Sequence, residues 1–136
     1  FGPWQLPEKL IPLIIINAIS NKPIPIYGDG KNIRDWIYVE DHVDALLKVA
    51  INGRVGDSYC IGGNQEKSNE EILELICEII DSFNKSNAPH NRLKVLVKDR
   101  PGHDMRYAID STKIRKELNW FPKYDFSKAM RSTVVL

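Results

Sequence analysis

The stretch KNIRDWIYVEDHVDALLKV, residues 31–49, changes from one secondary-structure period to another. Apolar side chains alternate with polar or aromatic ones over residues 33–39, which predicts a β-strand. From Glu40 or Asp41, either of which is a plausible N-cap, apolar residues recur at helical spacing until Gly53. We therefore expect a strand that leads directly into a capped amphipathic helix.

The composition of the chain shows no bulk electrostatic preference. The 136 residues include 19 basic and 18 acidic side chains, with a net charge of +1. This balance gives no support for a nucleic-acid partner or an anionic membrane, and the longest apolar run is far shorter than the ~20 residues of a membrane span. No signal-peptide pattern occurs either. We expect one cytoplasmic domain over residues 1–136, cut from a longer chain because it starts without Met.

The rest of the chain alternates predicted helices with short predicted strands. Ser68 and Glu71 form an S-x-x-E capping box ahead of the clearest amphipathic helix. Further helices are expected over residues 8–21, 111–118 (capped by Asp110 or Ser111) and 125–136, and extended segments at 24–27, 57–63 and 93–99. The pattern predicts a mixed α/β protein with too few alternations for a complete doubly wound sheet.

Motifs for independent catalysis are missing from the sequence. No G-x-G-x-x-G loop or P-loop occurs, and no His accompanies a Ser or Cys in a nucleophile motif. Cys60 and Cys77 lack metal-ligand spacing, and we interpret both as reduced thiols of the core. Two Tyr-x-x-x-Lys matches, at 27–31 and 124–128, fall on a turn and before a helix start. We therefore assign no catalytic, cofactor-binding or metal-binding residue.

The remaining chemical signal is a set of basic and aromatic side chains on separated segments, namely Lys9, Arg34, Arg100, His103, Arg106 and Tyr107. Such cations can converge on one phosphorylated ligand, to which a planar guanidinium donates two parallel hydrogen bonds. The spacing leaves an alternative equally open, in which Arg34 pairs with Asp35 or Asp104 and Arg100 caps a carbonyl. We expect the rings of Trp36, Tyr38 and Tyr107 to belong to the core rather than to stack on a base.

Several motifs in one order resemble the carboxyl-terminal part of the dTDP-glucose 4,6-dehydratases, which are extended short-chain dehydrogenases/reductases. They are PEKLIP at 7–12, RDWIYVEDH at 34–42, YCIGGN at 59–64 and RPGHDMRYAID at 100–110. Related nucleotide-sugar epimerases and decarboxylases generally lack the last run. The resemblance implies an α/β substrate-binding subdomain of short strands and several helices, with the Rossmann portion absent.

The resemblance also implies a set of substrate-binding residues, which are Lys9, Leu10, Pro25, Tyr27, Arg34, Arg100 and His103. Arg34 and Arg100 would hold the pyrophosphate of dTDP-glucose, and Pro25 with Tyr27 would border the thymidine. Cys60 occupies an eighth such position, where the family usually has an Asn that offers its amide to the ligand. A thiol is a poor replacement for that amide.

The activity that the resemblance implies is an NAD-dependent lyase reaction of deoxysugar biosynthesis. The whole enzyme would oxidise carbon 4 of dTDP-glucose, eliminate water across carbons 5 and 6, and return the hydride to carbon 6. An amino-terminal part outside this sequence would bind NAD and supply the catalytic residues, and the enzyme would be a homodimer through other regions. Residues 1–136 alone would be inactive. The open alternatives are a related epimerase or decarboxylase, and a nucleotide-sugar binding module without catalysis.

Overall fold

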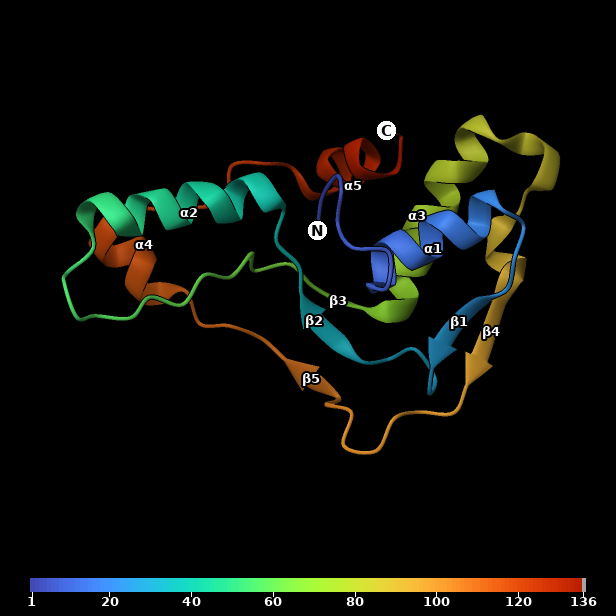
Figure 1. Cartoon of the computed structure of the whole chain (residues 1–136), viewed down its shortest axis with the longest axis horizontal. Coiled ribbons are helices and arrows are strands. Elements are labelled where there is room, and N and C mark those ends of the chain that lie inside the picture. The colour runs from blue at the N-terminus through green and yellow to red at the C-terminus, as the bar shows by residue number, and fades with distance from the viewer. Residues whose placement is uncertain (136) are drawn as a thin grey trace.

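Two groups of helices lie on either side of a small central sheet (Figure 1). The first group contains α1 (Leu10–Ile19), α3 (Asn69–Phe83) and α5 (Phe126–Val134), and the second contains α2 (Val39–Asn52) and α4 (Thr112–Leu118). Short 3-10 helices, η1 (Lys85–Asn87) and η2 (His90–Leu93), follow α3. These elements are those of a computed structural model, which describes residues 1–135. They confirm the predicted α/β class with short strands and several helices.

The strands form two small sheets. β1 (Ile24–Tyr27) pairs in parallel with β4 (Lys94–Val97). In the second sheet β2 (Ile33–Asp35) is central, antiparallel to β3 (Glu66–Ser68) and parallel to β5 (Arg106–Tyr107). β2 therefore joins two segments that are far from it in the sequence, and it lies between the two helix groups in Figure 1.

The larger hydrophobic core lies among α1, α3, α5 and β1. Its fully buried members include Ile14 of α1, Ile24 of β1 and Ile76 of α3. Each such side chain contributes roughly 1.5–3 kcal/mol by leaving water. In β1 the side chains at 24 and 26 are buried, whereas Pro25 and Tyr27 are more exposed. The alternation of this strand thus turns two predicted site residues away from the core.

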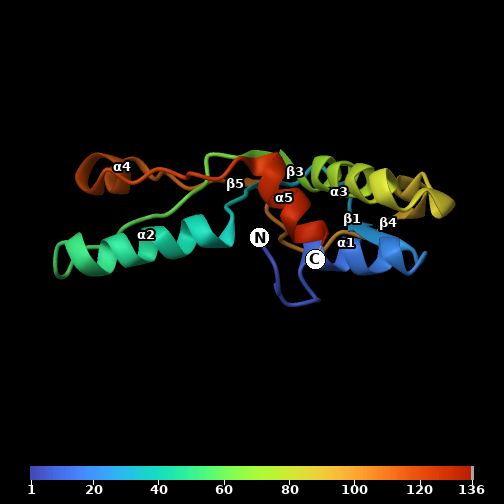
Figure 2. The same ribbon diagram turned by 90° about the horizontal axis from the view of Figure 1, so that it is seen from above.

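The smaller core lies between α2 and α4 and consists of Ala45, Ile114 and Trp120 with partly buried neighbours. Seen from above, α2 and α4 run alongside each other at one end of the molecule (Figure 2). Asp41 is buried in α2, and its carboxylate accepts the backbone N–H groups of Lys123 at 2.7 Å and Tyr124 at 3.3 Å. This carboxylate therefore ties the segment before α5 to the first turn of α2.

The strand predictions needed three corrections. The strand predicted over 33–39 ends at Asp35, because the backbone beyond it bonds to Gln65 and Phe1, which lie outside strands. Residues 57–63 form no strand; Gly63 instead packs so closely on the Trp36 carbonyl that a Cβ would lie 2.2 Å from its oxygen. The short strands β3 and β5 were not predicted, since three or fewer residues carry no readable alternation.

The helix predictions were confirmed more closely. Ser68 and Glu71 form the predicted capping box of α3, and Asp125 caps α5. α4 begins after Ser111 as predicted. The start of α2 was wrong, because its N-cap is Tyr38 and not an acidic residue. Position 136, the predicted end of the last helix, lies outside the described residues.

The apolar stripe of α2 faces outward instead of covering a core. Four apolar side chains of this stripe are about half exposed or more, namely Val43, Leu46, Leu47 and Ile51. By contrast, Asp41 and Ala45 face inward. Cys77 is buried as predicted, but Cys60 is exposed, which corrects the expectation that both thiols lie in the core. No helix within residues 1–135 combines the length and apolarity that crossing a bilayer requires.

We predict that Asp41→Ala lowers the free energy of unfolding by about 2–3 kcal/mol, because it leaves two backbone N–H groups without their charged acceptor. Urea denaturation followed by circular dichroism measures the loss. Asp57→Ala is the control, since Asp57 makes only an exposed ion pair with Lys113 and its removal costs ~1 kcal/mol or less. Equal losses in the two variants would contradict the role given to Asp41.

The capping box predicts a pH dependence of stability. The backbone N–H of Ser68, and then its hydroxyl, hold the pKa of Glu71 below its ordinary value. Because the pKa of Glu71 is lower in the folded than in the unfolded protein, its carboxylate stabilises the folded state at pH values above the unfolded pKa of about 4.3. This stabilisation is lost as the pH falls through the folded pKa.

Glu71→Gln should therefore unfold at a lower urea concentration than the wild type at neutral pH. The difference between the two urea midpoints should disappear as the solution is acidified. Glu78→Gln is the matched control, because Glu78 is exposed on the same helix with no hydrogen-bond partner among residues 1–135. A difference between the urea midpoints of Glu71→Gln and wild type that stays constant down to acidic pH would disprove that the Glu71 carboxylate stabilises the capping box.

Candidate functional site

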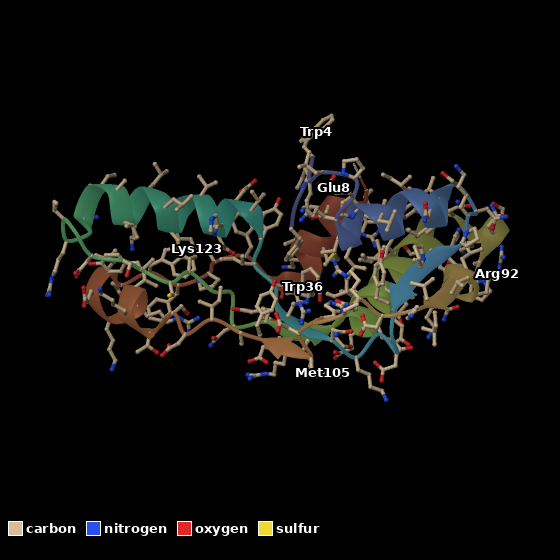
Figure 3. The ribbon with its side chains drawn as sticks, turned by 60° about the horizontal axis from the view of Figure 1, so that its bottom comes forward. Trp4, Glu8, Trp36, Arg92, Met105 and Lys123 are labelled. Carbon is tan, nitrogen blue, oxygen red and sulfur yellow. The ribbon has the colours of Figure 1, made fainter. Side chains whose placement is uncertain are left out.

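A pocket of about 840 Å³ opens between the start of α1, the strands β1 and β2, and the loop from β4 to β5. Figure 3 shows two of its lining residues, Glu8 beside the start of α1 and Trp36 near the centre of the molecule. The pocket brings together seven of the eight substrate-binding residues that the family resemblance implied, namely Lys9, Leu10, Pro25, Tyr27, Arg34, Arg100 and His103. Segments almost a hundred positions apart thus meet in one cavity.

Arg34 is placed in the pocket by β2, where it is paired with Lys67 of β3 and Tyr107 of β5. Its Nη2 donates to the backbone carbonyl of Asp104 at 2.8 Å, and its guanidinium lies 4.5 Å from the centre of the Tyr107 ring. Within residues 1–135 no carboxylate lies within ion-pair distance of Arg34, so the proposed pair with Asp35 or Asp104 does not form. The positive charge of Arg34 is left uncompensated by a partner.

Arg100 and His103 are the two ends of a tight turn that the R-P-G-H sequence produces. His103 N donates to Arg100 O at 3.2 Å, and Gly102 takes a φ of +70°. Proline at the second position and a left-handed glycine at the third are the requirements of a type II turn. The turn directs both side chains to the same pocket, where the Arg100 guanidinium lies 5.0 Å from the centre of the Tyr27 ring.

Asp99 orients His103 from behind. Its Oδ1 lies 2.6 Å from His103 Nδ1 and also accepts the backbone N–H of Arg100 at 2.8 Å. The contact with His103 is the main reason why the pKa of Asp99 lies below its ordinary value. His103 Nε2 in turn lies 3.4 Å from Arg100 Nη2, so the carboxylate, the imidazole and the guanidinium form a chain.

The opposite wall comes from the segment before α1. Lys9 is the N-cap residue of α1, and its ammonium lies 3.7 Å from the Glu8 carboxylate in a solvent-exposed pair. Leu10 and Pro25 add apolar surface to the pocket, and the Tyr27 ring adds more where it lies against Arg100. A ligand with a flat apolar group and an adjacent dianionic group would fit this combination of walls.

Two residues of the sequence-based set lie elsewhere. Cys60 is exposed in the segment 57–63 and does not line the pocket. Arg106 donates two hydrogen bonds to the Glu66 carboxylate, at 2.7 and 2.8 Å, and so serves the sheet. Tyr107 is 54% exposed at the pocket, which corrects its expected place in the core; Tyr38 is buried as expected.

The lining residues that were not anticipated from the sequence include the polar residues Gln5, Glu8 and Asn69. Each is a polar residue beside or within a motif used above, but single polar residues near a turn or a helix start are too common to be singled out. Among residues 1–135, no group of three or more His, Cys, Asp or Glu side chains is arranged to hold a metal ion.

Known proteins are similar to this chain in sequence and in fold. The dTDP-glucose 4,6-dehydratase of Neisseria gonorrhoeae is 49% identical over 138 residues, covering 98% of this chain and 40% of the relative. The crystal structure of the dTDP-glucose 4,6-dehydratase of Bacillus anthracis in complex with NAD is 45% identical, with a TM-score of 0.86 over 99% of this chain. The Streptomyces venezuelae enzyme with NAD and TYD bound is 37% identical, with a TM-score of 0.88.

The chain therefore spans about 40% of the length of the curated relatives it matches. This confirms that the resemblance drawn from the motifs extends along the chain but over only part of those enzymes. The family model described as GDP-mannose 4,6 dehydratase matches residues 2–133. Since this match takes in nearly every residue, the chain belongs to the GDP-mannose 4,6-dehydratase family.

Proposed function

We propose that this chain is the substrate-binding part of a dTDP-glucose 4,6-dehydratase and that its pocket holds dTDP-glucose. The observation that carries the proposal is the pair of guanidiniums, Arg34 and Arg100, which face one pocket without a carboxylate partner within residues 1–135. Arg34 is half-buried, and a half-buried cation that lacks an acidic partner is costly unless a ligand supplies the negative charge; Arg100 is more exposed and adds a second positive charge at the same pocket.

The pyrophosphate of a nucleotide sugar matches the two guanidiniums in charge. Each phosphoryl group carries one negative charge and presents oxygens to which a guanidinium fork donates two hydrogen bonds. Lys9 adds a third cation at the opposite wall, and Tyr27 with Pro25 offers a flat apolar border for thymine. We assign the diphosphate to Arg34, Arg100 and His103, and the thymidine to the β1 side.

The role of these residues in the reaction is positioning. NAD would supply the hydride chemistry in the whole enzyme, but the sequence has no glycine-rich dinucleotide loop, so none of these residues is assigned to NAD. Holding the nucleotide fixes the sugar relative to the reacting groups, and such orientation is a large catalytic contribution. Residues 1–136 alone would not turn over substrate. That the enzyme is a cytoplasmic homodimer stays a prediction of the resemblance.

Arg34→Ala and Arg100→Ala should each weaken binding of dTDP to the full-length protein by one to two orders of magnitude, the equivalent of about 1.5–3 kcal/mol for one charge-assisted contact. Calorimetric titration measures the affinity. Arg92→Ala is the matched control, because Arg92 lies on η2 at the far end of the molecule and bonds to Asn21 and Asn87 (Figure 3).

Unchanged affinity in both pocket variants would overturn the assignment. Titration with UDP and GDP separates the proposed enzyme from its relatives, since a dTDP-glucose dehydratase should bind dTDP most tightly. Conversion of dTDP-glucose to the 4-keto-6-deoxy sugar by the full-length protein tests the activity itself.

A further inference from the structure

Tyr107 lines the pocket beside Arg34, and its ring lies against the guanidinium instead of in the core. We infer that Tyr107 is a positioning residue, whose ring holds the Arg34 guanidinium in the orientation that binds the diphosphate. The ring acts through Arg34 and not through a contact of its own with the substrate. The inference rests on the proposed function, because it needs a diphosphate bound to Arg34.

The central sheet fixes the ring beside the guanidinium. Arg34 of β2 and Tyr107 of β5 are register partners in a parallel pair, so their side chains leave the same face of the sheet. Side chains alternate along a strand, so Arg106 leaves the opposite face, where it donates to the Glu66 carboxylate. A register slip of one residue would exchange these two faces. The position of the ring is therefore set by backbone pairing.

The Arg34 guanidinium uses only part of its hydrogen-bonding capacity within the protein. Its Nη1 donates to the Ile33 carbonyl at 2.7 Å and its Nη2 to the Asp104 carbonyl at 2.8 Å. The amide of Asn32, a residue only 2% exposed, donates to the same Asp104 carbonyl at 3.1 Å and so keeps this acceptor in place. Because a guanidinium has more N–H groups than these two bonds use, the others lack an acceptor among residues 1–135 and are available to phosphate oxygens.

The Tyr107 ring adds a restraint of a different kind. The central carbon of the Arg34 guanidinium lies over the ring, 4.5 Å from its centre, which is within the range of a cation–π contact. The face of the ring attracts the positive charge without cancelling it. A carboxylate in the same place would hold the guanidinium as well, but it would compete with the diphosphate for the same N–H groups. The ring therefore holds the cation and leaves it free to bind an anion.

Holding the guanidinium in advance should raise the affinity for the diphosphate. A long arginine side chain has many rotamers, and restricting them before the ligand arrives reduces the conformational entropy that binding must remove. Tyr107 is 54% exposed, so replacing its ring removes little buried surface from the fold. An effect on binding with little effect on stability is thus expected.

The test is a double-mutant cycle in the full-length protein, measured by calorimetric titration with dTDP. Tyr107→Leu removes the ring and should weaken binding about three- to tenfold, the range of a partly exposed cation–π contact. In the Arg34→Ala background the same substitution should change the affinity less than about twofold, because the group that the ring positions is gone. Tyr107→Phe, which restores the ring without the hydroxyl, should return the affinity to near that of the wild type.

Phe121→Leu is the matched control. Phe121 is 51% exposed, and its ring centre lies 5.7 Å from the Arg115 guanidinium, but it does not line the pocket. Its replacement removes an equally exposed ring from an arginine elsewhere in the molecule. The affinity of Phe121→Leu for dTDP should equal that of the wild type.

Wild-type affinity in Tyr107→Leu would overturn the inference while the proposed function stands. So would an equal loss in Tyr107→Phe, or an equal effect of Tyr107→Leu with and without Arg34, since either would indicate a direct contact with the ligand. Absence of dTDP binding by the wild type would overturn both. If the double variant binds too weakly for calorimetry, the cycle is measured from kcat/KM for dTDP-glucose. If Tyr107→Leu does not fold, Tyr107→Val replaces it, because a β-branched residue suits the strand.

Discussion

The pairing of β2 with two strands distant in the sequence is the constraint on which the rest of the structure depends. Three residues, Ile33 to Asp35, bond to β3 on one side and β5 on the other. β3 leads directly into α3 of the larger core, and β5 leads toward α4 of the smaller one. This pairing, together with the contacts of Asp41 with the segment before α5, relates the two helix groups in Figure 1.

The same pairing builds the pocket. It sets Arg34 against Tyr107 and the Asp104 carbonyl, while the parallel pairing of β1 with β4 places Tyr27 beside the R-P-G-H turn. Both guanidiniums lie against a tyrosine ring, which attracts a cation without neutralising it. Both positive charges thus line one pocket, with Arg34 half-buried and Arg100 exposed to solvent.

Sequence patterns predicted the helices better than the strands, for a physical reason. Helix ends depend on local contacts such as the Ser68–Glu71 box and the Asp125 cap, which involve residues three positions apart. Strands depend on partners far along the chain, and β3 and β5 exist only because β2 lies beside them. The exposed apolar stripe of α2 shows the same limit, because periodicity reveals an apolar face but not what it faces.

What the sequence by itself determined was local structure and chemical character: a capped α3 and a set of cations whose motifs in order resemble one enzyme family. It left Arg34 undecided between an ion pair and a ligand contact. Only the tertiary structure excluded the ion pair within residues 1–135, because Arg34 contacts two backbone carbonyls and the Tyr107 ring instead of a carboxylate, and it placed Cys60 outside the pocket. The physical reason is that charge compensation is a property of distances between segments, which residue order alone does not specify.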